Sequence, residues 1–163
     1  MLPLLLYSVA LLAADEIRIG SKLETITIED EKGKPKAVKL TEGKGTAVIF
    51  VDPACQATRY LAPTIDALQS DYKDKGIKFL ILNPATATNG NAARMLQVKL
   101  TPAMYLFDEA GMLVYRGRVD SAPSETSVSK REARAAIDAV MGKESVKEPE
   151  VPVENGCPLQ TAN

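Results

Sequence analysis

The chain of 163 residues contains no histidine and no tryptophan, and it has only two cysteines. The absence of histidine excludes Ser-His and Cys-His nucleophilic mechanisms and every metal site built on imidazole ligands. Lysine plus arginine (20) nearly balance aspartate plus glutamate (21), and a net charge of −1 argues against a nucleic-acid partner. Catalytic chemistry must therefore come from the two cysteines, the carboxylates, lysine, tyrosine or backbone groups.

The first residues, 1–14, carry no charge and are rich in leucine. This run is too short to span a bilayer as an ordinary helix, and its apolar centre with a small-residue exit is typical of an export signal. We therefore expect a periplasmic or secreted protein with no stable membrane insertion after processing. The alternative is an apolar first helix that packs on the core. Export matters because two cysteines persist as a disulfide in an oxidising compartment.

The rest of the chain has the length of one domain, and its hydrophobic pattern alternates between strand and helix periods. The β-branched segment 23–28 and segment 37–40 flank a turn and predict an N-terminal hairpin. Continuous apolar runs predict buried strands, and steps of three and four residues predict helices. The expected core segments are a strand at 46–51, a helix from Cys55 that ends at Gly76, and strands at 77–82, 103–107 and 112–119.

Two further helices are expected from their capping residues. Asn89 or Asn91 is placed to cap a short helix that runs through Val98. Ser129 and Glu132 have the spacing of a capping box in front of a final helix that stops at Gly142. The remaining segment, 143–163, contains three prolines and no periodicity, so we expect an extended tail. The mixed charges of this tail are interpreted as a solubility feature.

The order of these segments predicts an α/β fold. Strands 46–51 and 77–82 are joined by a helix and are expected to be parallel, whereas strands 103–107 and 112–119 are joined by a short turn and are expected to be antiparallel. The prediction is a mixed central sheet with helices on both faces, an N-terminal β-hairpin and an extended C-terminal tail.

Cys55 is the strongest candidate for chemistry. It lies between a buried strand and the start of a helix, where free backbone N–H groups stabilise a thiolate and lower the pKa of a cysteine. Asp52, three residues earlier, opposes this effect if its charge stays close. The alternative is a buried structural cysteine.

Thr101-Pro102 and Cys157 are the next candidates. Pro102 begins a strand after a helix, in a turn where a cis peptide bond is plausible. Cys157 is the only intramolecular partner for Cys55, and their bond would close a loop of about 100 residues. The alternatives are a tail thiol that pairs with another chain or has no role, and a Cu(I) site, since thiolate and thioether ligands suit that ion.

The chain resembles a thioredoxin-fold protein across residues 19–142. The resemblance rests on AVIFVD, on Cys55 at the next helix start, on KFLILN, and above all on TPAMYLFDEAGMLVYRGRVD. It is most similar to the redoxin group of the alkyl hydroperoxide reductase/thiol-specific antioxidant superfamily, including its secreted bacterial members. The resemblance implies that Cys55 is the attacking thiol and that Pro102 is a cis-proline facing it. Thr101 would offer backbone hydrogen bonds to a partner strand, and Cys157 would be a resolving or structural cysteine.

The chain departs from the patterns of that family at three positions. Thr58 replaces the second cysteine of CxxC, and it is taken as a substrate-binding residue with Thr101 and Pro102. Asp52 and Val48 replace the threonine and proline of the peroxidatic pattern PxxxTxxC. These departures favour disulfide exchange over peroxide reduction.

The leading prediction is a secreted thiol-disulfide oxidoreductase that needs no cofactor or bound metal. Cys55 would attack protein or small-molecule disulfides, and Cys157 or an external thiol would resolve the product. The alternatives are a non-catalytic thioredoxin-fold binding module with a structural Cys55–Cys157 disulfide, and a Cu(I) carrier.

Overall fold

The structure of this chain, a computed structural model, describes residues 16–121 and 130–160. The expected export signal at 1–14 and Ser129 of the expected capping box lie outside the described residues. No helix in the described part of the chain combines the length and the apolar character needed to cross a membrane.

The N-terminal hairpin is confirmed. Strands β1 (Thr25–Glu29) and β2 (Pro35–Lys39) pair in antiparallel register. Their turn is held by Asp30, whose carboxylate accepts hydrogen bonds from the backbone N–H groups of Lys32 and Lys34. Such a carboxylate-to-backbone turn is common at short connections.

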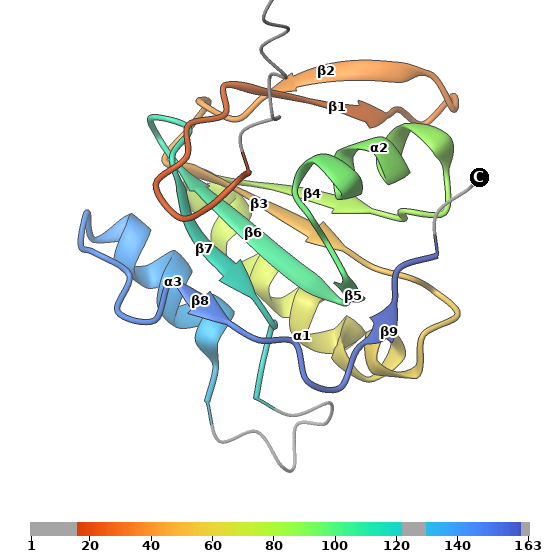
Figure 1. Ribbon diagram of the computed structural model, residues 1–163. Coiled ribbons are helices and arrows are strands. Elements are labelled where there is room, and N and C mark those ends of the chain that lie inside the picture. Colours follow the sequence, from red (N-terminus) through yellow and green to blue (C-terminus); the bar gives the residue numbers. More distant parts are fainter. Residues whose placement is uncertain (1–15, 122–129, 161–163) are drawn as a thin grey trace, which may run out of the picture.

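The central sheet is mixed and has five strands in the order β4-β3-β6-β7-β8 (Figure 1). Strand β3 lies parallel to β4 and antiparallel to β6, and β6 lies antiparallel to β7, so the expected strand directions are confirmed. All six residues of β3 are buried, as the apolar run predicted. The strand bounds are β3 (Gly45–Phe50), β4 (Ile77–Leu82), β6 (Ala103–Asp108), β7 (Leu113–Gly117) and β8 (Glu150–Val151).

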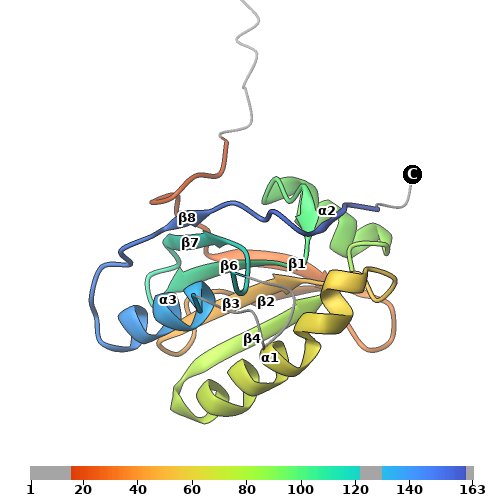
Figure 2. The same ribbon diagram turned by 90° about the horizontal axis from the view of Figure 1, so that it is seen from below.

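Two layers cover the sheet. Helices α1 (Gln56–Tyr72) and α3 (Glu132–Met141) lie on one face, and α2 (Ala87–Met95) lies with the hairpin on the other (Figures 1 and 2). Alternate residues of β3 enter the two cores: Ala47 and Ile49 pack with α1 and α3, whereas Val48 and Phe50 pack with α2 and the hairpin. This alternation follows from the two-residue period of a strand.

The ends of the helices differ in part from the expectations. Thr86, not Asn89 or Asn91, caps α2, because its hydroxyl accepts a hydrogen bond from the backbone N–H of Asn89. The Asn89 side chain instead accepts a hydrogen bond from the backbone N–H of Glu29 and ties α2 to the hairpin. Helix α1 continues into a short 3-10 helix, η1 (Lys73–Lys75), which Gly76 ends in the left-handed conformation.

The C-terminal tail is extended, but it forms two short strands that its sequence did not indicate. Strand β8 pairs with β7, and strand β9 (Cys157–Pro158) pairs antiparallel with β5 (Leu100–Thr101). Two-residue strands are too short to show periodicity in the sequence, so they are identified only by the strands with which they pair. The tail thus runs along the edge of the sheet and across the end of the domain (Figure 1).

Gly117 permits the close approach of the tail to β7. Its φ is +153°, and a Cβ built on it would lie 2.1 Å from the carbonyl oxygen of Val151. We therefore expect Gly117→Ala to force β8 away from β7 and to lower the free energy of unfolding by about 1–3 kcal/mol. Chemical denaturation would measure the stability, and hydrogen exchange of the Arg116 and Arg118 amides, which donate to the carbonyls of Pro149 and Val151, would measure the separation of β8 from β7.

Gly142→Ala is the matched control. Gly142 has an ordinary helical conformation, and its added Cβ would lie 3.4 Å from the nearest atom, the carbonyl oxygen of Asp138. This change should leave stability within about 0.5 kcal/mol and the exchange of the Arg116 and Arg118 amides unchanged. Unchanged exchange in Gly117→Ala as well would contradict the close packing of β8 on β7.

Candidate active site

Cys55 is the N-cap residue of α1, in the position expected from the sequence. The preceding loop is ordered locally: the Asp52 carboxylate accepts a hydrogen bond from the N–H of Ala54, and the Asp52 carbonyl accepts one from the N–H of Cys55. Helical bonding begins with the N–H of Arg59 donating to the Cys55 carbonyl. The sulfur therefore lies at the positive end of the helix dipole, and its side chain makes no cap hydrogen bond in this state.

Cys55 and Cys157 form a disulfide with a Cα–Cα distance of 5.8 Å, and they are 102 positions apart in the sequence. The intramolecular pairing is confirmed, and no cysteine of the chain is free in this structure. Cys55 is 2% exposed, whereas Cys157 is half-buried. In the oxidised protein the tail side of the disulfide is thus the more accessible one.

The expected cis peptide bond is present between Thr101 and Pro102. Thr101 carries two contacts at once: its carbonyl oxygen lies 3.6 Å from Cys55 Sγ, and its backbone pairs with Cys157 across β5 and β9. Pro102 is buried next to the same junction. The structure therefore brings Thr101, Pro102 and Cys157 together beside Cys55.

Two buried hydroxyl groups, on the helix that begins at Cys55 and on β5, have no hydrogen-bond partner among the described residues. Thr58, 8% exposed, lies one helical turn after Cys55, and Thr101 is fully buried. The Oγ1 atoms of both residues are without a partner. Buried hydroxyl groups are nearly always satisfied by protein groups or by water. In the reduced state a Cys55 thiolate would offer an additional acceptor to Thr58, which lies three residues further along α1.

A small pocket next to Pro102 reveals a residue that the sequence analysis missed. It lies between α1, the prolyl turn and the tail, and Arg118 lines it together with Glu154 and Gly156. Arg118 donates hydrogen bonds to Glu132 of α3 and forms an ion pair of 3.0 Å with Glu154 of the tail. Its hydrogen bond to Glu132, opposed by desolvation, raises the pKa of Arg118, so this side chain stays charged.

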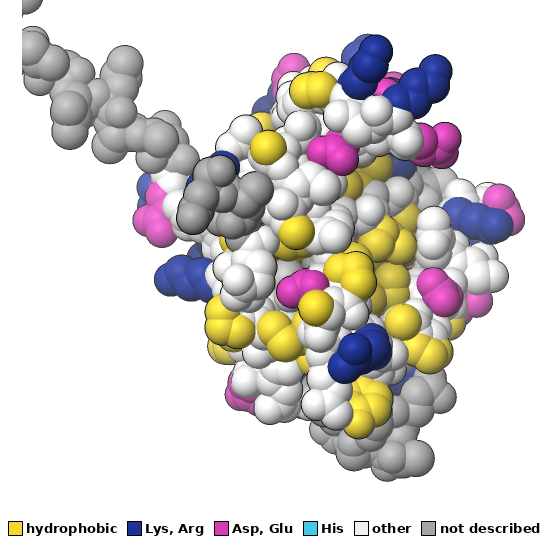
Figure 3. All heavy atoms as spheres, turned by 90° about the vertical axis from the view of Figure 1, so that its right-hand side faces the viewer, with side chains coloured by type: hydrophobic (Ala, Val, Ile, Leu, Met, Phe, Trp, Pro, Cys, Tyr) yellow, Lys and Arg dark blue, Asp and Glu magenta, His cyan; other side chains and the backbone are white. Residues whose placement is uncertain are grey.

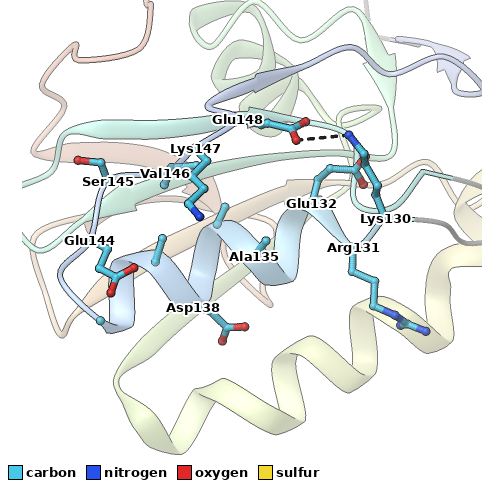
Figure 4. Close-up of a pocket in the computed structure, with 13 residues that line it drawn as sticks. Lys130, Arg131, Glu132, Ala135, Asp138, Glu144, Ser145, Val146, Lys147 and Glu148 are labelled. Atoms are coloured by element: carbon cyan, nitrogen blue, oxygen red, sulfur yellow. Dashed lines mark hydrogen bonds and ion pairs between the residues drawn. The ribbon is translucent and has the colours of Figure 1, made fainter.

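The acidic residues of the tail also contact the body of the domain. Glu148 pairs with Lys130, and Glu150 pairs with Arg116. Figure 4 shows the first of these pairs, in a hollow between α3 and residues 144–148. The interpretation of the tail charges as a solubility feature is therefore wrong for three of its glutamates, each of which has a basic partner. The spacing of these glutamates, Glu148, Glu150 and Glu154, does not by itself indicate ion pairs. It can be interpreted only when the position of the tail on the domain is known.

The surface beside the site is partly apolar. Hydrophobic side chains gather toward the middle of the face that carries α2 and β9, with charged side chains mainly toward its rim (Figure 3). Tyr60, in the first turns of α1, is 51% exposed, and its hydroxyl accepts a hydrogen bond from the Gln56 side chain. Within the described residues, no cluster of three or more acidic or cysteine side chains is arranged to hold a metal ion.

Comparison with solved structures identifies the architecture. An uncharacterised conserved protein from Geobacillus kaustophilus aligns with a TM-score of 0.74 at 19% identity, over 88% of this chain and 92% of the other. A protein from Chlorobium tepidum, assigned as the thiol:disulfide interchange protein DsbE, aligns with a TM-score of 0.59 at 21% identity, over 77% of this chain and 99% of the other. A protein from Neisseria meningitidis assigned as a thioredoxin aligns with a TM-score of 0.55 at 17% identity, over 76% of this chain and 92% of the other.

The chain has a thioredoxin-like fold. This agrees with the fold predicted from the sequence, a mixed sheet flanked by helices. No family profile matches the chain, and no curated protein matches its sequence. Identities near 20% establish the fold alone, so assignment of this thioredoxin-like protein to the alkyl hydroperoxide reductase superfamily stays a prediction.

The unpaired hydroxyl of Thr58 gives a prediction for the reduced site. In a Cys157→Ser background, Thr58→Val should raise the pKa of the Cys55 thiol by about one pH unit, because one hydrogen bond to the thiolate is lost. The pH dependence of alkylation by iodoacetamide would measure this pKa. In the oxidised wild-type background the same change should not lower stability, because this hydroxyl has no partner there within the described part of the chain.

Thr64→Val provides the control, since Thr64 is a buried threonine of the same helix two turns further from the sulfur. It should leave the pKa of the Cys55 thiol unchanged. Equal pKa values in the Thr58→Val variant and its parent would show that the Thr58 hydroxyl does not contact the thiolate.

Proposed function

We propose that this thioredoxin-like protein is a thiol-disulfide oxidoreductase that uses one helix cysteine and one tail cysteine. The observation that carries the proposal is the Cys55–Cys157 bond beside the cis-prolyl turn, with the tail paired to β5 at Thr101. A disulfide between the attacking and the resolving cysteine is the oxidised end state of such a cycle. A protein of the same fold from Chlorobium tepidum is assigned as a thiol:disulfide interchange protein, which supports the same chemistry.

The first step starts from the reduced protein. The Cys55 thiolate attacks one sulfur of a substrate disulfide, the other substrate sulfur leaves as a thiolate, and that thiolate takes a proton from solvent. The helix dipole stabilises the attacking thiolate, and the Thr58 hydroxyl, one turn further along α1, is the donor proposed to support it. The product is a mixed disulfide between Cys55 and the substrate.

The second step regenerates the bond seen here. The Cys157 thiolate attacks Cys55 Sγ, and the remaining substrate sulfur leaves as a thiolate. The substrate has gained two electrons, and the protein has lost two in forming Cys55–Cys157. An external dithiol returns the electrons, and an external thiol replaces Cys157 at the second step when that residue is absent. Peroxide reduction is the weaker option, because Asp52 replaces the threonine of the peroxidatic pattern.

Two substitutions test the cycle in an insulin reduction assay with dithiothreitol. Cys55→Ser should abolish the protein-dependent rate, because no attacking sulfur remains. Cys157→Ser should retain the first step, accumulate a mixed disulfide detectable by mass, and turn over more slowly through external thiol. Hydrogen peroxide consumption, followed in parallel, should stay near the uncatalysed rate for all three proteins.

The same assay separates catalysis from the non-catalytic alternative. A structural disulfide is favoured by the burial of Cys55 and by the many contacts of the tail, and it would close a loop worth about 4–5 kcal/mol. In that case native protein would resist dithiothreitol until it unfolds, and Cys55→Ser would lose stability with no activity to lose. Cu(I) binding by the two thiolates stays a prediction that the same reduced protein, titrated with Cu(I), would test.

We further propose that the protein acts in an oxidising compartment, the periplasm or the exterior. The apolar run 1–14 and a cysteine pair suited to disulfide formation support this location. In acid-quenched cells of the source organism, the wild-type chain should not react with a maleimide-polyethylene glycol reagent unless it is first reduced. A Cys157→Ser chain should gain one adduct on Cys55, and two adducts on unreduced wild type would argue for a reducing compartment.

A further inference from the structure

The tail occupies the site as a bound peptide would. Its cysteine is joined to Cys55, its backbone extends β5 through the pairs Cys157–Thr101 and Pro158–Leu100, and the N–H of Leu159 donates to the Lys99 carbonyl. The side chains of Val153 and Leu159, on either side of the cysteine, pack against the hydrophobic core. The tail therefore contacts the domain through its sulfur, its backbone and its apolar side chains together.

A substrate in mixed disulfide with Cys55 would occupy the surface that the tail occupies. This surface, which we call the track, runs along β5 and past Arg118. The substrate sulfur would lie about 2 Å from Cys55 Sγ, where Cys157 Sγ lies in the tail-bound state. In the tail-bound state Cys55 is 2% exposed, and the Thr101 carbonyl on β5 lies 3.6 Å from its sulfur. The groups of the domain that bind the tail would therefore also contact a substrate segment.

One of these features is steric. Gly156 directly precedes the tail cysteine, and a Cβ built on it would lie 2.6 Å from the Thr101 carbonyl oxygen and 2.8 Å from the Val153 side chain. The first contact is with backbone, which cannot move aside without disturbing β5. Only glycine fits directly before a cysteine bound in this way.

The other feature is electrostatic. Glu154, three positions before the cysteine, pairs with Arg118 at 3.0 Å. The Arg118 guanidinium is also held by Glu132, whose side chain is 4% exposed, so it stays in place when the tail leaves. Further along the track, Arg116 and Lys130 bind the tail glutamates Glu150 and Glu148. A row of three cations thus faces the segment that precedes the cysteine, and Arg118 is the one held in place by a buried carboxylate.

We propose that the track vacated by the reduced tail selects extended protein segments with glycine directly before the reacting cysteine and an acidic residue three positions before it. This inference rests on the proposed function and specifies its substrate class. The tail itself is then an internal copy of the substrate, and its return displaces the product from Cys55.

Synthetic peptides with the sequence of residues 149–160 test this selectivity on the full-length reduced Cys157→Ser protein. Each peptide carries its cysteine as a mixed disulfide with nitrothiobenzoate. The Cys55 thiolate attacks the peptide sulfur, the coloured nitrothiobenzoate anion leaves, and its appearance gives the rate. The set comprises the native sequence and three variants, which carry Glu154→Gln, Glu154→Lys and Gly156→Val.

The native peptide should react about threefold faster than the glutamine variant, because that variant loses one partly exposed ion pair with Arg118. It should react about tenfold faster than the lysine variant, which also places a like charge beside Arg118. The valine variant should react at least about tenfold slower, because of the clash with Thr101. High salt should shrink the charge effect and leave the steric effect unchanged, since only the former is screened.

The failure of this inference is distinguishable from failure of the proposed function. Equal rates for all four peptides would overturn the selectivity and leave the oxidoreductase cycle intact. A Cys55 that reacts with none of them, while free cysteine releases the same anion under these conditions, would overturn the cycle itself. An Arg118→Gln protein should lose the preference for glutamate over glutamine and keep the preference for glycine. A retained glutamate preference in that variant would overturn the role of Arg118.

Discussion

The junction at Thr101 is the contact on which the rest of this site depends. One residue of β5 faces the sulfur at the start of α1 with its carbonyl and pairs with the tail cysteine through its backbone. These groups come from three distant parts of the chain: Cys55 caps α1, Thr101 lies two residues before β6 of the central sheet, and Cys157 lies on the tail. The tail is the only partner in the junction that can leave without disrupting a buried strand or helix of the central domain.

The energetics of the tail suit a segment that docks and leaves. Its ion pairs involve glutamates that are half or more exposed, and each such pair contributes about 0–1 kcal/mol. Its strands have two residues each, so few backbone bonds are lost when it leaves. The covalent bond to Cys55 is the constraint that keeps the tail from leaving the folded domain, whereas its loop-closure contribution of about 4–5 kcal/mol acts through the unfolded chain. Reduction of that bond would therefore change the tail from a fixed to an exchangeable ligand of its own domain.

Much of the fold was predictable because its signals are local. Strands β3 and β4 are continuous apolar runs, α1 has an apolar stripe at helical spacing, and Gly76 ends the helical segment, so periodicity located all of them. The cap of α2 was assigned to the wrong residue because Thr86 and Asn89 are both good capping residues. Only the position of Glu29 decides that Asn89 binds the hairpin instead.

The sequence by itself determined the relative directions of two strand pairs, the place of Cys55 at a helix start and its one possible intramolecular partner, because each depends on neighbours in the chain or on a count of two cysteines. The tertiary structure alone decided that the tail pairs with β5, that Gly156 must be small and that Arg118 holds both Glu132 and Glu154. Those features join residues far apart in sequence, and their physical basis is close approach in space. No periodicity or composition along the chain encodes such proximity.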